Sequence, residues 1–167
     1  MTVLETERLR LRPWTAAESD IQLWLDLHAD SAITEFIGTY TRESATERLT
    51  GMEKQWQDRG HGQFVVESRT DGTFLGRAGL NYWEQFDEVE AAWTFRASAW
   101  GNGYATEAAK TFLPWGFEAL NVPYITAMIR PHNVRSQRVA DRLGFTHFRH
   151  DTLFGNPVIV NVRHRPE

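Results

Sequence analysis

Hydrophobic and polar residues alternate over residues 7–14 (ERLRLRPW), and this period of two predicts a β-strand. The period then changes, because Ile21, Leu25 and His28 recur at helical spacing and predict an amphipathic helix. A second helical stretch follows and runs to about Arg59, where nearby glycines end it. The N-terminal part of the chain is therefore predicted to form one strand and two helices.

Two short motifs mark where these helices should begin. Thr15 with Glu18, and Ser44 with Glu47, have the three-residue spacing of a capping box, in which two side chains satisfy backbone amides at a helix start. We therefore expect the two helices to begin beside Thr15 and Ser44.

The rest of the chain alternates between strand-like and helix-like patterns. Strands are predicted over 63–68, 73–83, 88–97 and 123–130, helices over about 103–120 and 133–144, and a closing hairpin over 145–164. The predicted order is β-α-α-β-β-β-α-β-α-β-β. This order indicates an α/β (α+β) fold, a mixed central sheet of about seven strands with helices on both faces.

Composition narrows the class of protein. The 167 residues fit one domain, predicted over 1–167, and 41% hydrophobic residues suffice for a core. The chain has no cysteine, which excludes disulfides and thiolate sites, and its six histidines lack metal-ligand spacing, so no metal is expected. With no long apolar run and no signal-peptide pattern, we expect a cytoplasmic protein without a membrane partner.

The net charge of −4 is unevenly distributed along the chain. Residues 1–60 carry 7 lysines and arginines against 11 acids, residues 61–129 carry 4 against 8, and residues 130–167 carry 7 against 3. Such an acidic chain is a poor nucleic-acid partner on electrostatic grounds. The basic C-terminal part either suits a smaller anion or is a solvated helix face.

The stretch AWGNGYATEAAK, residues 99–110, joins a glycine loop to a strong helix-forming run. A helix N-terminus leaves backbone N–H groups unpaired and carries partial positive charge, so it favours phosphate. Glycine lets the backbone approach such a ligand closely. Five consecutive amides are placed to converge on a pyrophosphate, those of Gly101, Asn102, Gly103, Tyr104 and Ala105.

Other interpretations of this loop stay open. A glycine turn that joins a strand to a helix needs no ligand. The loop is not a P-loop, since no Gly-Lys-Ser/Thr follows, and it lacks the G-x-G-x-x-G of dinucleotide-binding folds. A nucleotide-binding module is disfavoured further because the loop contains no lysine.

Several motifs occur in a fixed order over most of the chain. They are ETERLRLRPW near the N-terminus, the acid-bearing strand from Glu90 to Ala97, WGNGYATEA (100–108), ITAMIRPHN (125–133), Ser136 and LGF (143–145). Together they resemble the GNAT acetyltransferases, and in particular the branch of ribosomal-protein N-terminal (RimJ/RimL-like) acetyltransferases. Trp100 departs from the wider family pattern, which has a glutamine or arginine there.

The resemblance implies transfer of an acetyl group from acetyl-CoA to a primary amine, without a metal. The glycine loop would bind the pyrophosphate, and the backbone of Trp93, Thr94 and Phe95 would pair with the pantetheine arm like an added strand. The amide of Thr94 or Phe95 would donate to the thioester oxygen, an effect worth roughly 3 kcal/mol where it has been tested.

Glu90 is the candidate general base that removes the amine proton, through a water molecule. Glu88, Glu90, Ala92 and Thr94 share one face of the predicted strand. The alternatives are that both glutamates are solvated strand residues, or that they bind a cationic substrate without moving protons.

The resemblance places further site residues on the short C-terminal helix. Many relatives carry a tyrosine seven residues after the asparagine, where this chain has an alanine. Ser136 is therefore the implied acid or hydrogen-bond donor for the CoA thiolate. Asn133 is expected to cap the helix and contact the pantetheine. Arg138, in a cluster with Arg130 and Arg135, is the candidate for the 3′-phosphate of CoA.

The amine acceptor is expected to enter between the N-terminal helices and the closing hairpin. Acids there would attract a cationic amine and aromatics would pack on it, namely Glu35, Glu43, Glu84, Asp87, Glu88, Phe36, Tyr40, Trp83 and Phe86. A protein or peptide α-amine ranks first as acceptor, and a small-molecule amine second. A non-catalytic acyl-CoA-binding or sensor module is the alternative, and exposed aromatics on outer strands would permit a homodimer.

Overall fold

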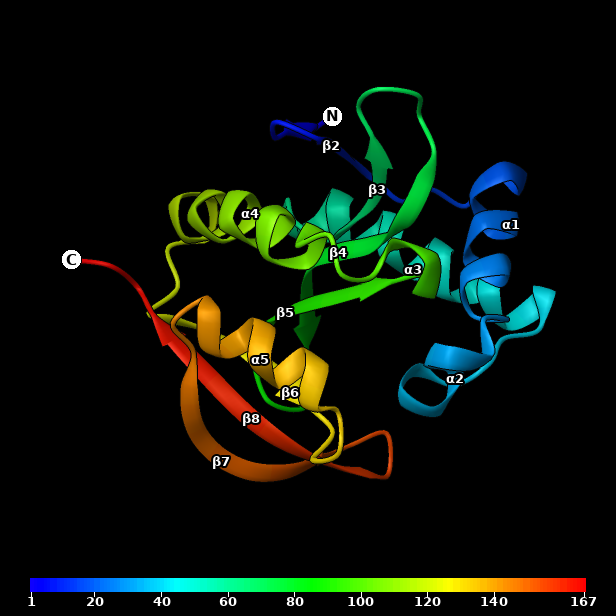
Figure 1. Ribbon diagram of the computed structural model, residues 1–167. Coiled ribbons are helices and arrows are strands. Elements are labelled where there is room, and N and C mark those ends of the chain that lie inside the picture. Colours follow the sequence, from blue (N-terminus) through cyan, green and yellow to red (C-terminus); the bar gives the residue numbers. More distant parts are fainter.

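A computed structural model describes residues 1–167, and its centre is one eight-stranded sheet with the order β1-β2-β3-β4-β5-β6-β8-β7 (Figure 1). The strands are β1 (Leu4–Glu5), β2 (Leu9–Pro13), β3 (Gln63–Ser68), β4 (Phe74–Trp83), β5 (Glu88–Phe95), β6 (Tyr124–Ile129), β7 (Thr146–Leu153) and β8 (Asn156–His164). All neighbouring strands are antiparallel except β5 and β6. The predicted mixed sheet is confirmed, with the short β1 added to the seven strands expected.

Helices cover both faces of the sheet, as predicted. They are α1 (Glu18–Leu27), α2 (Ser31–Ile37), α3 (Arg42–Arg59), α4 (Tyr104–Leu120) and α5 (Val134–Arg142), with a 3-10 turn at Ala97–Ala99. Figure 1 shows α4 and α5 in front of the sheet and α3 behind it. The sequence pattern did not predict α2, whose N-terminal cap is Asp30, a side chain that accepts from the Ala32 amide.

Both capping-box predictions are wrong. Helix α1 begins after Ala17 with no side-chain cap, because the Thr15 amide and hydroxyl both donate to Asp20, which is itself paired with an arginine of β2. Helix α3 begins after Thr41, which forms a capping box with Ser44. A tertiary ion pair therefore determines the first start, and an earlier threonine determines the second.

Two hydrophobic clusters hold the helices on opposite faces of the sheet. Phe64 of β3 belongs to the larger cluster with Phe112 of α4, whereas the next residue, Val65, belongs to the smaller cluster with Trp24 of α1 and Leu49 of α3. Neighbouring strand residues point to opposite faces, which explains the division. Burying each such large side chain contributes about 1.5–3 kcal/mol, so both helix layers are firmly held.

Two surface features bear on the remaining expectations. None of the helices combines the length and the apolar character needed to cross a membrane. Phe148 on β7 and Phe154 in the β7–β8 turn are 51% and 74% exposed, so the outer strands do carry exposed aromatic side chains. The homodimer that such side chains would permit stays a prediction.

Candidate active site

Strands β5 and β6 separate at the centre of the sheet. They pair in register only at Glu90 and Thr126, although β5 continues to Phe95 and stays paired with β4 along its length. The Arg96 amide donates to a β4 carbonyl, so by alternation the amides of Phe95 and Trp93 point away from β4. This edge of β5 has no partner strand and is open to an extended ligand.

A cavity of about 720 Å³ lies along this open edge and is formed by α2, the end of β5, the glycine loop and α5. Its size suits a small-molecule ligand. Its lining includes most of the residues predicted to bind acetyl-CoA: Trp93, Thr94, Phe95, Gly101, Gly103, Tyr104, Ala105, Asn133, Ser136 and Arg138. Asn102 is not in the lining, because its side chain donates back to the carbonyls of Ala99 and Trp100.

The glycine loop leaves the first amides of α4 unpaired. The first bond of the helix runs from the Glu107 amide to the Gly103 carbonyl, so the amides of residues 104–106 have no backbone acceptor. Gly101 and Gly103 have φ angles of +82° and +76°, a left-handed conformation that glycine adopts without strain. The backbone path into α4 therefore requires these glycines, and it brings the unpaired amides to the cavity.

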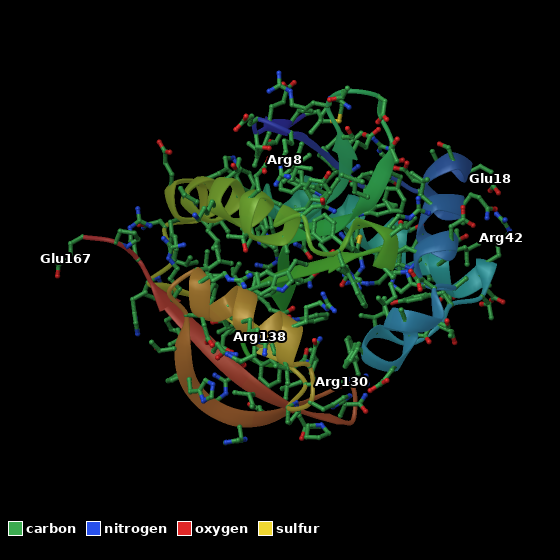
Figure 2. All side chains as sticks on the ribbon, in the orientation of Figure 1. Arg8, Glu18, Arg42, Arg130, Arg138 and Glu167 are labelled. Atoms are coloured by element: carbon green, nitrogen blue, oxygen red, sulfur yellow. The ribbon has the colours of Figure 1, made fainter.

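Arg8, which directly precedes β2, anchors the glycine loop (labelled in Figure 2). Its guanidinium donates to the Asn102 carbonyl and to the Glu107 carboxylate, each at 2.7 Å, and lies 4.6 Å from the centre of the Tyr104 ring. Desolvation raises the pKa of Glu107, but bonds from Thr6 and Arg8 outweigh it and hold that pKa below its usual range. Sequence reasoning missed Arg8, whose only signal was its place in the N-terminal motif.

Helix α5 presents Ser136 to β5. Trp93 Nε1 donates to Ser136 Oγ at 2.9 Å, which leaves the hydroxyl proton of Ser136 free for another acceptor. Asn133 caps α5 by accepting from the Ser136 amide at 3.2 Å, as expected. These contacts fix a free hydroxyl donor beside the open edge of β5.

The arginines of the basic C-terminal part do not all gather at the cavity. Arg135, Arg138 and Arg142 line it from α5. Arg130 instead donates to a backbone carbonyl of α2 at 2.6 Å, and Figure 2 shows it between α5 and α2. Of the three arginines predicted to cluster, Arg130 is therefore the one that does not line the cavity.

Glu90 is buried, with 5% exposure, where β5 and β6 separate. Its carboxylate accepts from Asn81 Nδ2 at 3.1 Å, from Trp83 Nε1 at 2.8 Å and from the Met128 amide at 3.3 Å. Burial raises the pKa of Glu90, and these bonds together with the charge of Arg77 oppose the rise without cancelling it. A raised pKa favours proton uptake nearer neutral pH, which a general base needs.

Several acids expected to attract a cationic amine already have partners. Glu88 is 6% exposed and accepts from Arg149 at 2.6 and 2.9 Å. Glu35 lies 3.1 Å from His132, and Asp87 accepts from a tyrosine hydroxyl at 2.6 Å. The alternative of solvated strand glutamates is therefore wrong, because tertiary contacts bury both Glu88 and Glu90.

Comparison with known proteins agrees with this architecture. The family model described as the acetyltransferase (GNAT) domain matches residues 8–146, and the chain belongs to this family of acetyltransferases. The N-acetyltransferase p20 of Bacillus licheniformis is 27% identical over 151 residues, which are 87% of this chain and 83% of that protein. The predicted family and enzyme class are confirmed.

Solved structures extend the similarity to the whole fold. An acetyltransferase from Agrobacterium tumefaciens str. C58 is 30% identical with a TM-score of 0.86, over 99% of this chain and 95% of that one. RimL, a ribosomal L7/L12 α-N-protein acetyltransferase solved with coenzyme A, has a TM-score of 0.79 at 16% identity, over 98% of each chain. The structure brings no three histidines, aspartates or glutamates close enough to hold a metal ion.

Proposed function

We propose that the protein transfers an acetyl group from acetyl-CoA to a primary amine held in the same complex. One observation carries the proposal: unpaired amides of α4 and the open edge of β5 meet in a single cavity. Helix N-terminal amides favour a pyrophosphate. An open strand edge favours the amide groups of pantetheine, which add to it as a short strand.

Residues around the cavity match the other parts of the co-substrate. The amides of Gly101, Gly103, Tyr104 and Ala105 bind the pyrophosphate, and Arg138 binds the 3′-phosphate, beside Arg135 and Arg142. Arginine suits a phosphate because its planar fork forms two parallel hydrogen bonds. Asn133 supports the pantetheine arm from the start of α5.

Phe95 is the donor to the thioester oxygen. The carbonyl of Thr94 lies against Gly76 of β4, so the polar backbone groups of Thr94 face β4. The Phe95 amide points instead to the open edge, where negative charge develops on the oxygen during the reaction. Loss of such a donor costs roughly 3–4 kcal/mol of transition-state stabilisation in enzymes where it has been tested.

Glu90 and Ser136 move the protons. Glu90 takes a proton from the ammonium group through a water molecule, and the neutral nitrogen then attacks the thioester carbon. The new C–N bond forms as the C–S bond breaks with its electron pair on sulfur. Ser136 donates its hydroxyl proton to that thiolate and regains one as the nitrogen loses its second. Holding the amine beside the thioester supplies much of the rate.

The acceptor is a primary amine. A protein or peptide α-amine ranks first, supported by the name of RimL, which states that activity for that protein. A small-molecule amine ranks second. Pairing of Glu35, Glu88 and Asp87 with other side chains leaves fewer free acids for a highly cationic amine.

Calorimetric titration of acetyl-CoA into the purified protein, with ATP as the control, tests the proposal first. We expect micromolar binding of acetyl-CoA and no comparable binding of ATP. A thiol-release assay over peptides and small amines then measures turnover. Absence of acetyl-CoA binding to the folded protein would refute the proposal, and binding without amine-dependent thiol release would favour a sensor module instead.

A further inference from the structure

Two arginines lie near one another on the sheet face that α1 and α3 cover, and neither forms an ion pair. Arg77 of β4 and Arg48 of α3 are both partly buried. Neither guanidinium has a carboxylate oxygen within 4.0 Å, whereas the partly buried Arg12 and Arg149 each have one within 3 Å. Partly buried positive charges without an acidic partner are costly to maintain in a folded protein.

The partners of these arginines are neutral. Arg77 donates to Gln63 Oε1 at 3.0 Å and lies 3.4 Å from His28 Nε2, while its own Nε is buried without a partner. Arg48 donates to Asn81 Oδ1 at 3.3 Å. A guanidinium has five N–H donors, so both side chains keep donors for another acceptor. An unpaired buried donor is unfavourable, and a ligand oxygen would satisfy it.

The charges around the pair leave a positive surplus. Burial lowers the pKa of His28 to about 3, so this neighbour is neutral at pH 7. Burial likewise lowers the pKa of Arg77 to about 10, which leaves it charged. Glu90 is the carboxylate whose charge acts on both arginines, and Tyr40 is the other titratable side chain that faces them. Two positive charges therefore meet one negative charge.

The pair also adjoins the reaction centre. Arg77 and Thr94 are direct partners across β4 and β5, so their side chains share a face about 5 Å apart. Thr94 lines the cavity of the acetyl-CoA site. Asn81, which Arg48 contacts, is the direct partner of Glu90. An anion on these arginines is thus only a few covalent bonds away from an amine at Glu90.

We infer that Arg48 and Arg77 bind a carboxylate of the acceptor, which is therefore a primary amine with a carboxylate a few bonds away. The inference rests on the proposed acetyl transfer and names the substrate class of that site. Arginine forks match a carboxylate with paired hydrogen bonds. Two kinds of acceptor share this chemistry, a free amino acid and a peptide that begins with aspartate or glutamate.

Matched pairs of acceptors test the inference and separate its two sources. Alanine is compared with alaninamide, and a peptide that begins with aspartate is compared with the same peptide that begins with asparagine. We expect kcat/KM to be at least about 10-fold higher for the carboxylate member of one pair, which corresponds to about 1.4 kcal/mol. The first pair identifies a free amino acid and the second an acidic peptide. Equal rates within both pairs would overturn the inference.

Substitutions connect this preference to the arginines. Arg48→Gln should lower the preference at least about 10-fold through KM for the acceptor, with KM for acetyl-CoA unchanged, and Arg77→Lys should weaken it. Arg59→Gln is the matched control, because Arg59 ends the same helix and stacks 3.4 Å from the centre of the Tyr82 ring. Thermal melts check that each variant is folded. If a variant does not fold, Arg48→Lys is measured in its place. A preference that Arg48→Gln leaves intact would overturn the inference.

Equilibrium binding keeps the test independent of turnover. With CoA present, calorimetry should detect the preferred carboxylate acceptor on the wild type and the Arg59→Gln control, and at least 10-fold weaker binding on Arg48→Gln. If the carboxylate acceptor binds equally to all three proteins, or does not bind to the wild type, the inference is overturned while the proposed acetyl transfer still stands. Failure of acetyl-CoA itself to bind would overturn the proposed function instead.

Discussion

Trp93 Nε1 donates a 2.9 Å hydrogen bond to Ser136 Oγ and so joins β5 to α5 across the cavity. The bond uses one lone pair of the hydroxyl and leaves its proton available. The Ser136 amide donates to Asn133 Oδ1, so hydrogen bonds hold both the backbone and the hydroxyl group of Ser136 in place. Ser136 is therefore oriented before any ligand arrives, which lowers the entropic cost of its proton transfer.

Replacement of Ser136 by alanine should lower kcat about 10- to 100-fold with little change in KM for acetyl-CoA. This loss lies at or below the lower limit of the roughly 100- to 10,000-fold that acid–base catalysis typically contributes, because a thiolate leaves readily without help. Steady-state thiol release measures both constants. Trp93→Phe, which removes only the orienting donor, should give a smaller loss, and an unchanged kcat in Ser136→Ala would contradict the proton-donor role.

Glu90→Gln should lower kcat/KM about 100- to 10,000-fold and alter its pH profile. The ionised carboxylate is the base, so activity rises with pH as Glu90 loses its proton. Because burial raises its pKa, this rise should lie above pH 4.5, the ordinary pKa of glutamate. The rise should disappear in Glu90→Gln and persist in Glu118→Gln, an exposed control on α4. Identical acidic limbs in the wild type and Glu90→Gln would exclude Glu90 as the base.

Gly103→Trp should reduce the affinity for acetyl-CoA more than 10-fold, because an indole beside the unpaired amides obstructs the pyrophosphate. Gly103→Ala separates strain from obstruction, since an added Cβ meets only Arg8 Nη2, at 3.9 Å. With φ at +76°, the alanine should cost about 1–2 kcal/mol of stability. Calorimetry and denaturant melts measure the two effects.

Gly51→Ala in α3 is the control for these variants. An added Cβ there contacts nothing within 4 Å, and the helical φ suits alanine, so stability should rise by about 0.5–1 kcal/mol. Undiminished acetyl-CoA binding by a folded Gly103→Trp would contradict the assignment of the loop to the pyrophosphate.

The free energy of unfolding should fall as the pH is lowered below 6.5. Burial, followed by the charge of Arg77, lowers the pKa of His28 from 6.5 to about 3. Between these values the unfolded chain binds a proton that the folded chain does not, so each pH unit removes up to about 1.4 kcal/mol. Urea titrations at pH 7, 6 and 5 measure this slope.

His28→Gln should make that slope shallower without abolishing it. Burial also lowers the pKa of His61, which contributes to stability with the same sign. The variant loses only the part of the pH dependence that His28 supplies. Equal slopes in the wild type and His28→Gln would show that His28 takes up its proton equally well in the folded and unfolded chains.

The sequence predicted elements best where the hydrophobic period alone determines them. Strand β3 spans the predicted residues 63–68, and α4 begins one residue after the predicted start. Helix α2 was missed because only Ile33 of its seven residues is buried, too few to show a helical period. The start of α1 was misplaced because Asp20, bound to Arg12 at 2.9 Å, takes the hydrogen bonds of Thr15.

The sequence predicted the glycine loop and the hydroxyl group of the site well, but it predicted the roles of the arginines poorly. Motif order located the glycine loop and Ser136, and both line the cavity. Arginines look alike in a sequence, so nothing there distinguished Arg8, which anchors the loop, or Arg48 and Arg77, which have no acidic partner. Their surroundings arise only when distant segments pack together.

The sequence by itself determined the family, the strand and helix periods and the glycines whose positive φ angles turn the chain into α4. These properties are local, or depend on motifs in a fixed order. Only the tertiary structure decided that Glu90 is buried where β5 and β6 separate, that the Phe95 amide faces the open edge, and that Arg77 lies beside Thr94. Burial, strand pairing and charge balance depend on residues far apart in the chain, and they exist only once the sheet has formed.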